Sequence, residues 1–61
     1  MEIRYTYEAD GKFLVGYLDE YPEHPTQAFS IEELEENLKD IFALIQDGTL
    51  EAKKHGVLQL A

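Results

Sequence analysis

The sequence contains no cysteine, few basic residues and no long apolar run. Without cysteine, disulfides and thiolate metal sites are excluded, and the absence of cysteine fits a cytoplasmic protein. No apolar stretch approaches the roughly 18 residues that a membrane-spanning helix requires. The first residues alternate between polar and apolar side chains, which is not the pattern of a signal peptide.

The shortage of basic residues limits the partners that the chain can bind. Thirteen acidic residues against five basic ones give a net charge of −8. Contacts to phosphate groups need clustered lysine and arginine, so we expect no direct binding to nucleic acid. The acidic excess favours a basic partner, or serves only to keep the surface soluble.

The chain has 61 residues, and we interpret residues 1–61 as a single domain. A chain this short buries only about 60% of the surface that its unfolded form exposes. Small domains often depend on disulfides, metals or self-association for their stability. Two histidines, His24 and His55, are too few to indicate a structural metal. We therefore expect a bound partner or self-association, as a homodimer or a higher oligomer.

The first part of the chain has the pattern of a β-hairpin. Residues Met1 to Glu8 alternate between apolar and polar side chains, which is typical of a half-buried strand. Asp10-Gly11 predicts a two-residue turn, and Phe13 to Leu18 then forms the returning strand. With this turn, Tyr7 lies opposite Leu14 on the returning strand, and Tyr5 lies opposite Gly16.

The predicted register separates the two faces of the hairpin. One face is apolar and is the natural site for a helix, and Gly16 leaves a gap on it that Tyr5 or a helix side chain can fill. The other face carries three large apolar side chains that one helix cannot also cover. We predict that these residues form an oligomer interface: Phe13, Val15 and Tyr17.

A proline-containing segment follows the hairpin. Tyr21-Pro22 and His24-Pro25 interrupt regular structure, so we predict a loop from Asp19 to Pro25. Thr26 to Phe29 is predicted as a short third strand.

The second half of the chain contains one clear helix. Ser30 and Glu33 have the spacing of a capping box, which predicts that the helix begins after Ser30. Gly48 is predicted just beyond its last turn. An apolar stripe at helical spacing follows the cap: Ile31, Leu34, Leu38, Ile41, Phe42 and Ile45.

Val57 to Leu60 is predicted to be a short strand that can add to the sheet. The predicted order is therefore β-β-β-α-β. This is an α+β domain with one helix packed on a mostly antiparallel sheet.

The sequence shows no catalytic constellation. Ser30 with His24 or His55 could act as a nucleophile and its base, but Ser30 is better explained as the helix cap. The glutamates that follow lie on a solvated helix face rather than in the contrasting environments that acid–base catalysis requires. Asp19, Glu20 and Glu23 could hold a divalent ion, but their spacing matches no known calcium loop. We predict that the chain is not an enzyme and has no metal site and no cofactor.

Two adjacent segments carry a family likeness. The segment from Gly16 to Ala28, with its acidic proline-containing stretch, precedes a Ser-x-Glu-Glu-Leu-x-x-Asn helix that starts at Ser30. The order of these elements resembles the HicB-like antitoxins of bacterial toxin–antitoxin pairs. The likeness extends over nearly the whole chain.

The resemblance implies a partial ribonuclease-H-like fold without the catalytic carboxylates of ribonuclease H. It also implies binding to a HicA-like toxin, a small basic ribonuclease that cleaves mRNA and that the antitoxin blocks. Many members of the family carry a further DNA-binding domain at the C-terminus, and these 61 residues contain none. The alternative is a stand-alone oligomeric domain of the same family, with a regulatory or structural role and no toxin partner.

The acidic segment between the second strand and the helix is our candidate for the partner-binding site. Two prolines stiffen it, which lowers the cost of ordering it on binding, and tyrosine is enriched among interface hot spots. The alternative contact surface is the glutamate-rich face of the helix. We predict that the following residues bind the partner: Asp19, Glu20, Tyr21, Glu23 and His24.

Overall fold

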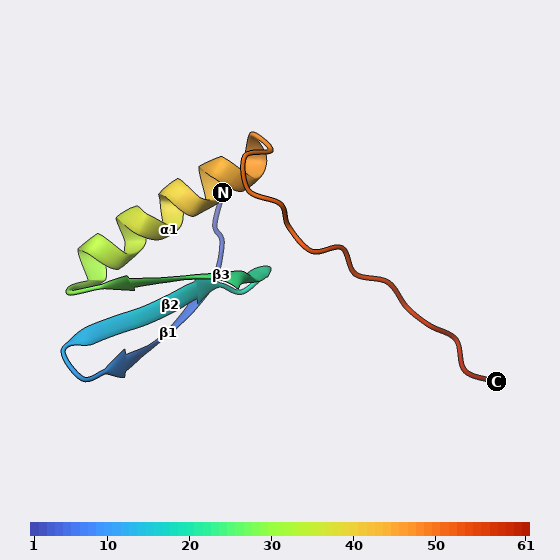
Figure 1. Cartoon of the computed structure of the whole chain (residues 1–61), viewed down its shortest axis with the longest axis horizontal. Helices are drawn as coiled ribbons and strands as arrows, with labels where there is room; N and C mark the ends of the chain where they lie inside the picture. Colours follow the sequence, from blue (N-terminus) through green and yellow to red (C-terminus); the bar gives the residue numbers. More distant parts are fainter.

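The computed structural model describes all 61 residues and contains three strands followed by one helix. The strands β1 (Tyr5–Asp10), β2 (Phe13–Leu18) and β3 (Tyr21–Ala28) form one antiparallel sheet in the order β1-β2-β3. The helix α1 (Ile31–Gln46) lies across one side of this sheet (Figure 1). The prediction of an α+β domain with one helix on an antiparallel sheet is confirmed.

The first hairpin forms, but its turn lies further along the chain than predicted. Asp10 pairs with Phe13, so Gly11 and Lys12 are the two turn residues. Gly11 has a φ of 63°, and no non-glycine residue has a positive φ. Positive φ at the first turn residue alone is the pattern of a type II′ turn, whereas the predicted type I′ turn needs it at both.

The shifted turn changes the register by two residues. Tyr7 therefore lies opposite Gly16, and Tyr5 lies opposite Leu18. The predicted pairing of Tyr5 with Gly16 is wrong. Because side chains alternate with a period of two, every side chain still points to the predicted face.

The segment predicted as a loop is mostly a strand. β3 begins at Tyr21, immediately after a tight turn at Asp19-Glu20, and runs to Ala28. The pairing with β2 is irregular between Gly16 and Leu18, where β3 has three more residues than β2. Pro22 and Pro25 lie in this bulged stretch, at the edge of the sheet, where a missing N–H is tolerated.

The helix begins and ends where the sequence predicts. The Glu33 N–H donates to the Ser30 Oγ at 3.1 Å, and Glu33 Oε1 accepts from the Phe29 N–H at 3.4 Å. At the other end Asp47 is the C-cap and Gly48 follows with a φ of 86°. The capping prediction for Ser30 is confirmed.

The core lies between α1 and the strands β2 and β3. Four apolar residues are buried there: Leu18, Ala28, Leu34 and Leu38. Leu34 is fully buried, and its Cδ2 would lie 3.2 Å from a Cβ on Gly16. A helix side chain thus fills the gap that Gly16 leaves, as expected. The Asn37 side chain also donates to the Gln27 carbonyl oxygen at 3.1 Å, which ties the helix to β3.

The predicted last strand is absent. Residues 51–61 contain no helix or strand, and they extend away from the sheet (Figure 1). Val57, Leu58 and Leu60 are 91%, 83% and 85% exposed. The order is therefore β-β-β-α, and the prediction of a strand from Val57 to Leu60 is wrong. The chain leaves the helix next to β3, whose prolines lack the N–H groups that a fifth element would need for pairing.

Candidate protein-interaction surface

The acidic turn at Asp19-Glu20 is exposed and firmly held. The Asp19 N–H donates to the Arg4 carbonyl oxygen at 3.0 Å, which extends the β1–β2 pairing to the turn. The Thr6 hydroxyl donates to Asp19 Oδ1 at 2.6 Å. Glu20 makes no such contact and its side chain is exposed at the end of the sheet. The turn thus exposes two carboxylates on a backbone that hydrogen bonds hold in place.

Tyr21 is less available than a loop residue would be. It is half-buried, and its ring centroid lies 6.5 Å from that of Phe42 on α1. The ring therefore packs at the margin of the core. A partner can reach only the remaining part of the ring.

Glu23 and His24 are both half-buried in β3. The His24 ring donates through Nε2 to the Glu51 carbonyl oxygen at 2.6 Å, so it fixes the start of the C-terminal segment. Glu23 Oε1 is buried and has no hydrogen-bond partner. The five predicted binding residues therefore lie close together in the chain at one end of the sheet, but only Asp19 and Glu20 are exposed.

The three residues predicted as an oligomer interface share the sheet face opposite the helix. Phe13 lies opposite Asp10, Val15 opposite Glu8 and Tyr17 opposite Thr6. The Phe13 ring centroid lies 4.9 Å from that of Phe29, a residue that is 69% exposed. Phe29 was not among the predicted residues, because it was predicted to end the third strand and faces were assigned only for the first hairpin; the structure places it just after β3. The open face, defined by Phe13, Val15, Tyr17 and Phe29, is thus an uncovered apolar surface.

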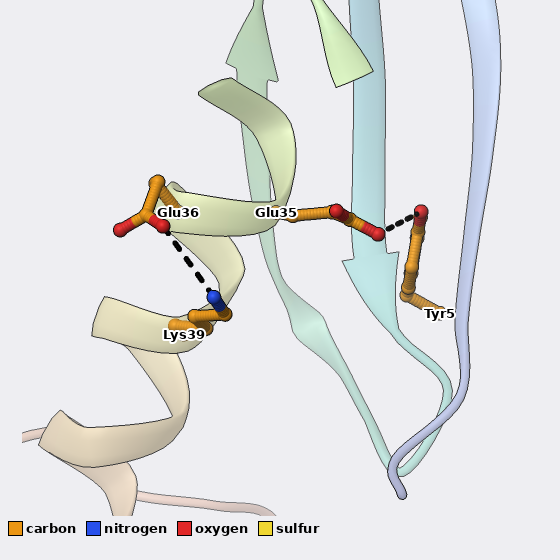
Figure 2. A network of polar contacts seen from close by, with 4 residues as sticks. All are labelled: Tyr5, Glu35, Glu36 and Lys39. Carbon is orange, nitrogen blue, oxygen red and sulfur yellow. Dashed lines mark hydrogen bonds and ion pairs between the residues drawn. The ribbon is translucent and has the colours of Figure 1, made fainter. Parts of the chain in front are cut away.

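A groove lies between the N-terminal segment and the helix. Its volume is about 400 Å³. The Tyr5 hydroxyl donates to Glu35 Oε2 at 2.9 Å across this groove, and Lys39 pairs with Glu36 at 3.4 Å (Figure 2). The hydrogen bond to Glu35 raises the pKa of Tyr5 above its ordinary value of 10.0. Seven residues line the groove: Met1, Glu2, Ile3, Arg4, Tyr5, Glu35 and Lys39.

Sequence reasoning missed this groove because the predicted first strand included Met1 to Arg4. The structure starts β1 only at Tyr5. It also places α1 over β2 and β3, and only Tyr5 of β1 reaches the helix. The helix-side face of β1 is therefore uncovered beyond Tyr5. The narrow apolar stripe of the single helix is the sequence signal that could have indicated this.

The structure brings together no catalytic or metal-binding group from the residues considered in the sequence. The Ser30 hydroxyl oxygen accepts the Glu33 N–H, as a helix cap does. No group of three or more histidine, aspartate and glutamate side chains is placed to hold a metal ion. Glu32, Glu35 and Glu36 are exposed on the helix. This arrangement offers charge and hydrogen-bond acceptors to another molecule.

The negative charge is concentrated on the folded part of the chain. Twelve of the thirteen acidic residues and three of the five basic ones lie in residues 1–50, which gives that part a net charge of −9. Lys53 and Lys54 lie in the extended segment after the helix. The sheet and helix therefore present an acidic body to any partner.

Comparisons with protein-family models, with curated proteins and with solved structures find no match to this chain. The chain has no helix of the length and apolar character needed to cross a bilayer.

Proposed function

We propose that this chain is a protein-binding domain that neutralises a basic partner, in the manner of a HicB-like antitoxin that blocks a HicA-like mRNA-cleaving toxin. The proposal rests on the resemblance of the segment from Gly16 to Ile41 and on the chain's acidity. The proposal includes a ribonuclease-H-like relationship for the three strands and the helix. It also includes a location in the cytoplasm.

The concentration of acidic side chains on residues 1–50 is the observation that carries the proposal. A ribonuclease must present positive charge to its RNA substrate, so an acidic protein can cover that surface and match its charge. The Asp19-Glu20 turn offers exposed carboxylates on a backbone held by Arg4 and Thr6. Such a preformed contact surface needs little ordering when it binds.

Co-expression tests this function directly. The chain should rescue growth when a small basic ribonuclease encoded next to it is expressed. Glu20→Lys should reduce the rescue and lower the association rate, with the largest effect at low salt. Glu32→Lys, which makes the same charge change on the exposed helix face, is the matched control. A larger loss of rescue with Glu32→Lys would indicate that the partner contacts the exposed face of the helix instead of the turn.

Tyr21 needs a milder substitution than alanine because its ring packs against Phe42. Tyr21→Phe keeps that packing and removes only the hydroxyl. If Tyr21 anchors the partner through its hydroxyl, this variant should fold normally and bind less tightly. A folded wild-type chain that fails to rescue growth from every neighbouring basic small protein would contradict the antitoxin proposal.

The second candidate function is a stand-alone oligomeric domain. The exposed aromatic pair of Phe13 and Phe29 on the open face favours it, because an uncovered apolar surface is typical of an interaction site. In that case the chain should self-associate but bind no basic ribonuclease. Pull-down from the native host, with the folded chain as bait, separates the two functions.

A further inference from the structure

The two edges of the sheet differ in how they are protected. β3 contains Pro22 and Pro25 and a bulge, which are common ways to prevent further strand pairing. β1 contains no proline and pairs with β2 without a bulge over all six of its residues. Its outer side has no neighbour. Of the two edges, only β1 is regular and open.

The unpaired backbone groups of β1 can be assigned to particular residues. The hydrogen bond from the Asp19 N–H to the Arg4 oxygen makes Arg4 and Asp19 a hydrogen-bonded pair. In an antiparallel ladder such pairs alternate along the strand. The even-numbered residues of β1 therefore bond to β2, and the N–H and C=O groups of Tyr5, Tyr7 and Ala9 point outward.

The helix leaves two of these residues uncovered. Because α1 packs on β2 and β3, the side chains of Tyr7 and Ala9 are exposed on the helix side of β1, and Tyr7 is 48% exposed. The Tyr5 and Tyr7 rings lie side by side there, with centroids 5.8 Å apart. The open edge thus combines free backbone groups with exposed aromatic rings.

We propose that β1 pairs antiparallel with β1 of a second copy of this chain, with Tyr7 on the two-fold axis. The outward groups of Tyr5, Tyr7 and Ala9 then bond to those of Ala9, Tyr7 and Tyr5 in the second copy. The two three-stranded sheets become one continuous sheet of six strands. This inference is independent of the proposed function.

Charge favours this register. With Tyr7 on the axis, Arg4 lies opposite Asp10 of the second copy. This pair occurs twice by symmetry. Opposite charges across neighbouring strands stabilise the pairing, and no like charges face each other.

Neighbouring registers that use the same outward groups are less favourable. With Thr6 on the axis, Arg4 faces Glu8 of the second copy, but the outward groups of Ala9 face Ile3, which lies outside β1. With Glu8 on the axis, the two Glu8 side chains face each other. Like charges directly opposite each other are destabilising. Only the register centred on Tyr7 pairs Tyr5, Tyr7 and Ala9 with one another and places no like charges opposite each other.

Sedimentation equilibrium of the full chain from micromolar to millimolar concentration tests the pairing. An edge-to-edge contact is smaller than the roughly 1,600 Å² of a standard interface, so the dimer fraction should rise over this range. Arg4→Glu and Asp10→Lys should each weaken the dimer by about tenfold or more, because each converts two attractive pairs into two repulsive ones. The double variant should restore dimerisation, since the charges are then exchanged.

Glu8→Lys is the matched control, because it makes the same charge change as Asp10→Lys but faces Thr6 of the second copy. It should change the dimer constant by no more than about twofold. Circular dichroism and thermal unfolding should show that all four variants keep the wild-type fold, since Arg4, Glu8 and Asp10 are exposed and none forms an ion pair.

Three results would overturn the proposal. The first is a protein that stays monomeric up to millimolar concentration. The second is a dimer that survives both single charge reversals but dissociates with Val15→Lys, which would place the contact on the open face. The third is protection of the Tyr5, Tyr7 and Ala9 amides from hydrogen exchange that does not depend on concentration, because the C-terminal segment of the same chain would then occupy the edge.

Discussion

The Tyr5 hydroxyl donates a hydrogen bond to Glu35 that is 2.9 Å long, and no other side-chain hydrogen bond joins β1 to α1. The helix otherwise packs mainly on β2 and β3. This hydrogen bond therefore spans the groove and links β1 to the helix.

We predict that Tyr5→Phe lowers the stability of the fold at neutral pH and flattens the loss of stability at alkaline pH. The raised pKa of Tyr5 means that the folded state holds the phenol proton more tightly than the unfolded state does. The stability that this contributes is fully present below pH 10.0 and is lost as pH rises through the folded-state pKa. Chemical denaturation at neutral and at alkaline pH measures both effects. Tyr17→Phe, which breaks no intramolecular hydrogen bond, is the control and should leave both unchanged.

At acid pH we expect a contribution from Asp47. The Thr49 side chain and its N–H, which lies 2.8 Å from Asp47 Oδ1, hydrogen-bond the carboxylate and lower its pKa below 3.8. The stabilisation is present above pH 3.8 and is lost as pH falls through the lowered value. Asp47→Asn should therefore flatten the acid limb of a stability-versus-pH curve. Asp40→Asn, at an exposed helix position, is the control and should leave that limb as it is.

The Ser30 cap should contribute measurably to stability. Ser30→Ala leaves the Glu33 N–H without its acceptor and should cost ~1 kcal/mol in the free energy of unfolding. Ser30→Asp restores an acceptor and should recover most of this loss. Partner binding should be nearly unchanged once the loss of folded protein is taken into account. Loss of binding with unchanged stability would contradict the capping role.

Gly16 and Leu34 should be energetically coupled. A Cβ on Gly16 would lie 3.1 Å from the Thr6 carbonyl oxygen and 3.2 Å from Leu34 Cδ2, so Gly16→Ala should cost ~1–3 kcal/mol. Leu34→Ala removes a fully buried side chain and should cost about 2–5 kcal/mol. In the double variant the new methyl group enters part of the cavity, so the combined cost should be smaller than the sum. Chemical denaturation of the wild type, the two single variants and the double variant gives the coupling free energy. Strict additivity would show that the two sites do not share this space.

The sequence predicted local features well where a few neighbouring residues decide them. The helix start at Ser30 and its end before Gly48 depend on local hydrogen bonds and on positive φ, and both were predicted correctly. The faces of the hairpin also followed from alternation. The turn itself was misplaced because Asp10-Gly11 and Gly11-Lys12 are both compatible with a two-residue loop, and only the pairing decides between them.

Features that depend on packing between distant segments were harder to predict. Pro22 and Pro25 correctly indicated irregular backbone, but the edge position of β3 allows a strand to pass through them. The apolar residues of Val57 to Leu60 indicated a strand, yet no sheet edge receives them. Tyr21 and His24 were expected to be free for a partner, and their contacts with Phe42 and Glu51 come from residues more than 20 positions away.

The prolines of β3 also determine where growth of the sheet stops. Pro22 and Pro25 have no N–H, so the outer side of β3 cannot act as the regular donor edge for another strand. When two copies join through β1, both exposed ends of the resulting sheet are β3 strands. Each added molecule uses its only open edge on the first contact, so two molecules form a closed assembly. The chain can thus carry an unprotected strand without polymerising into fibres.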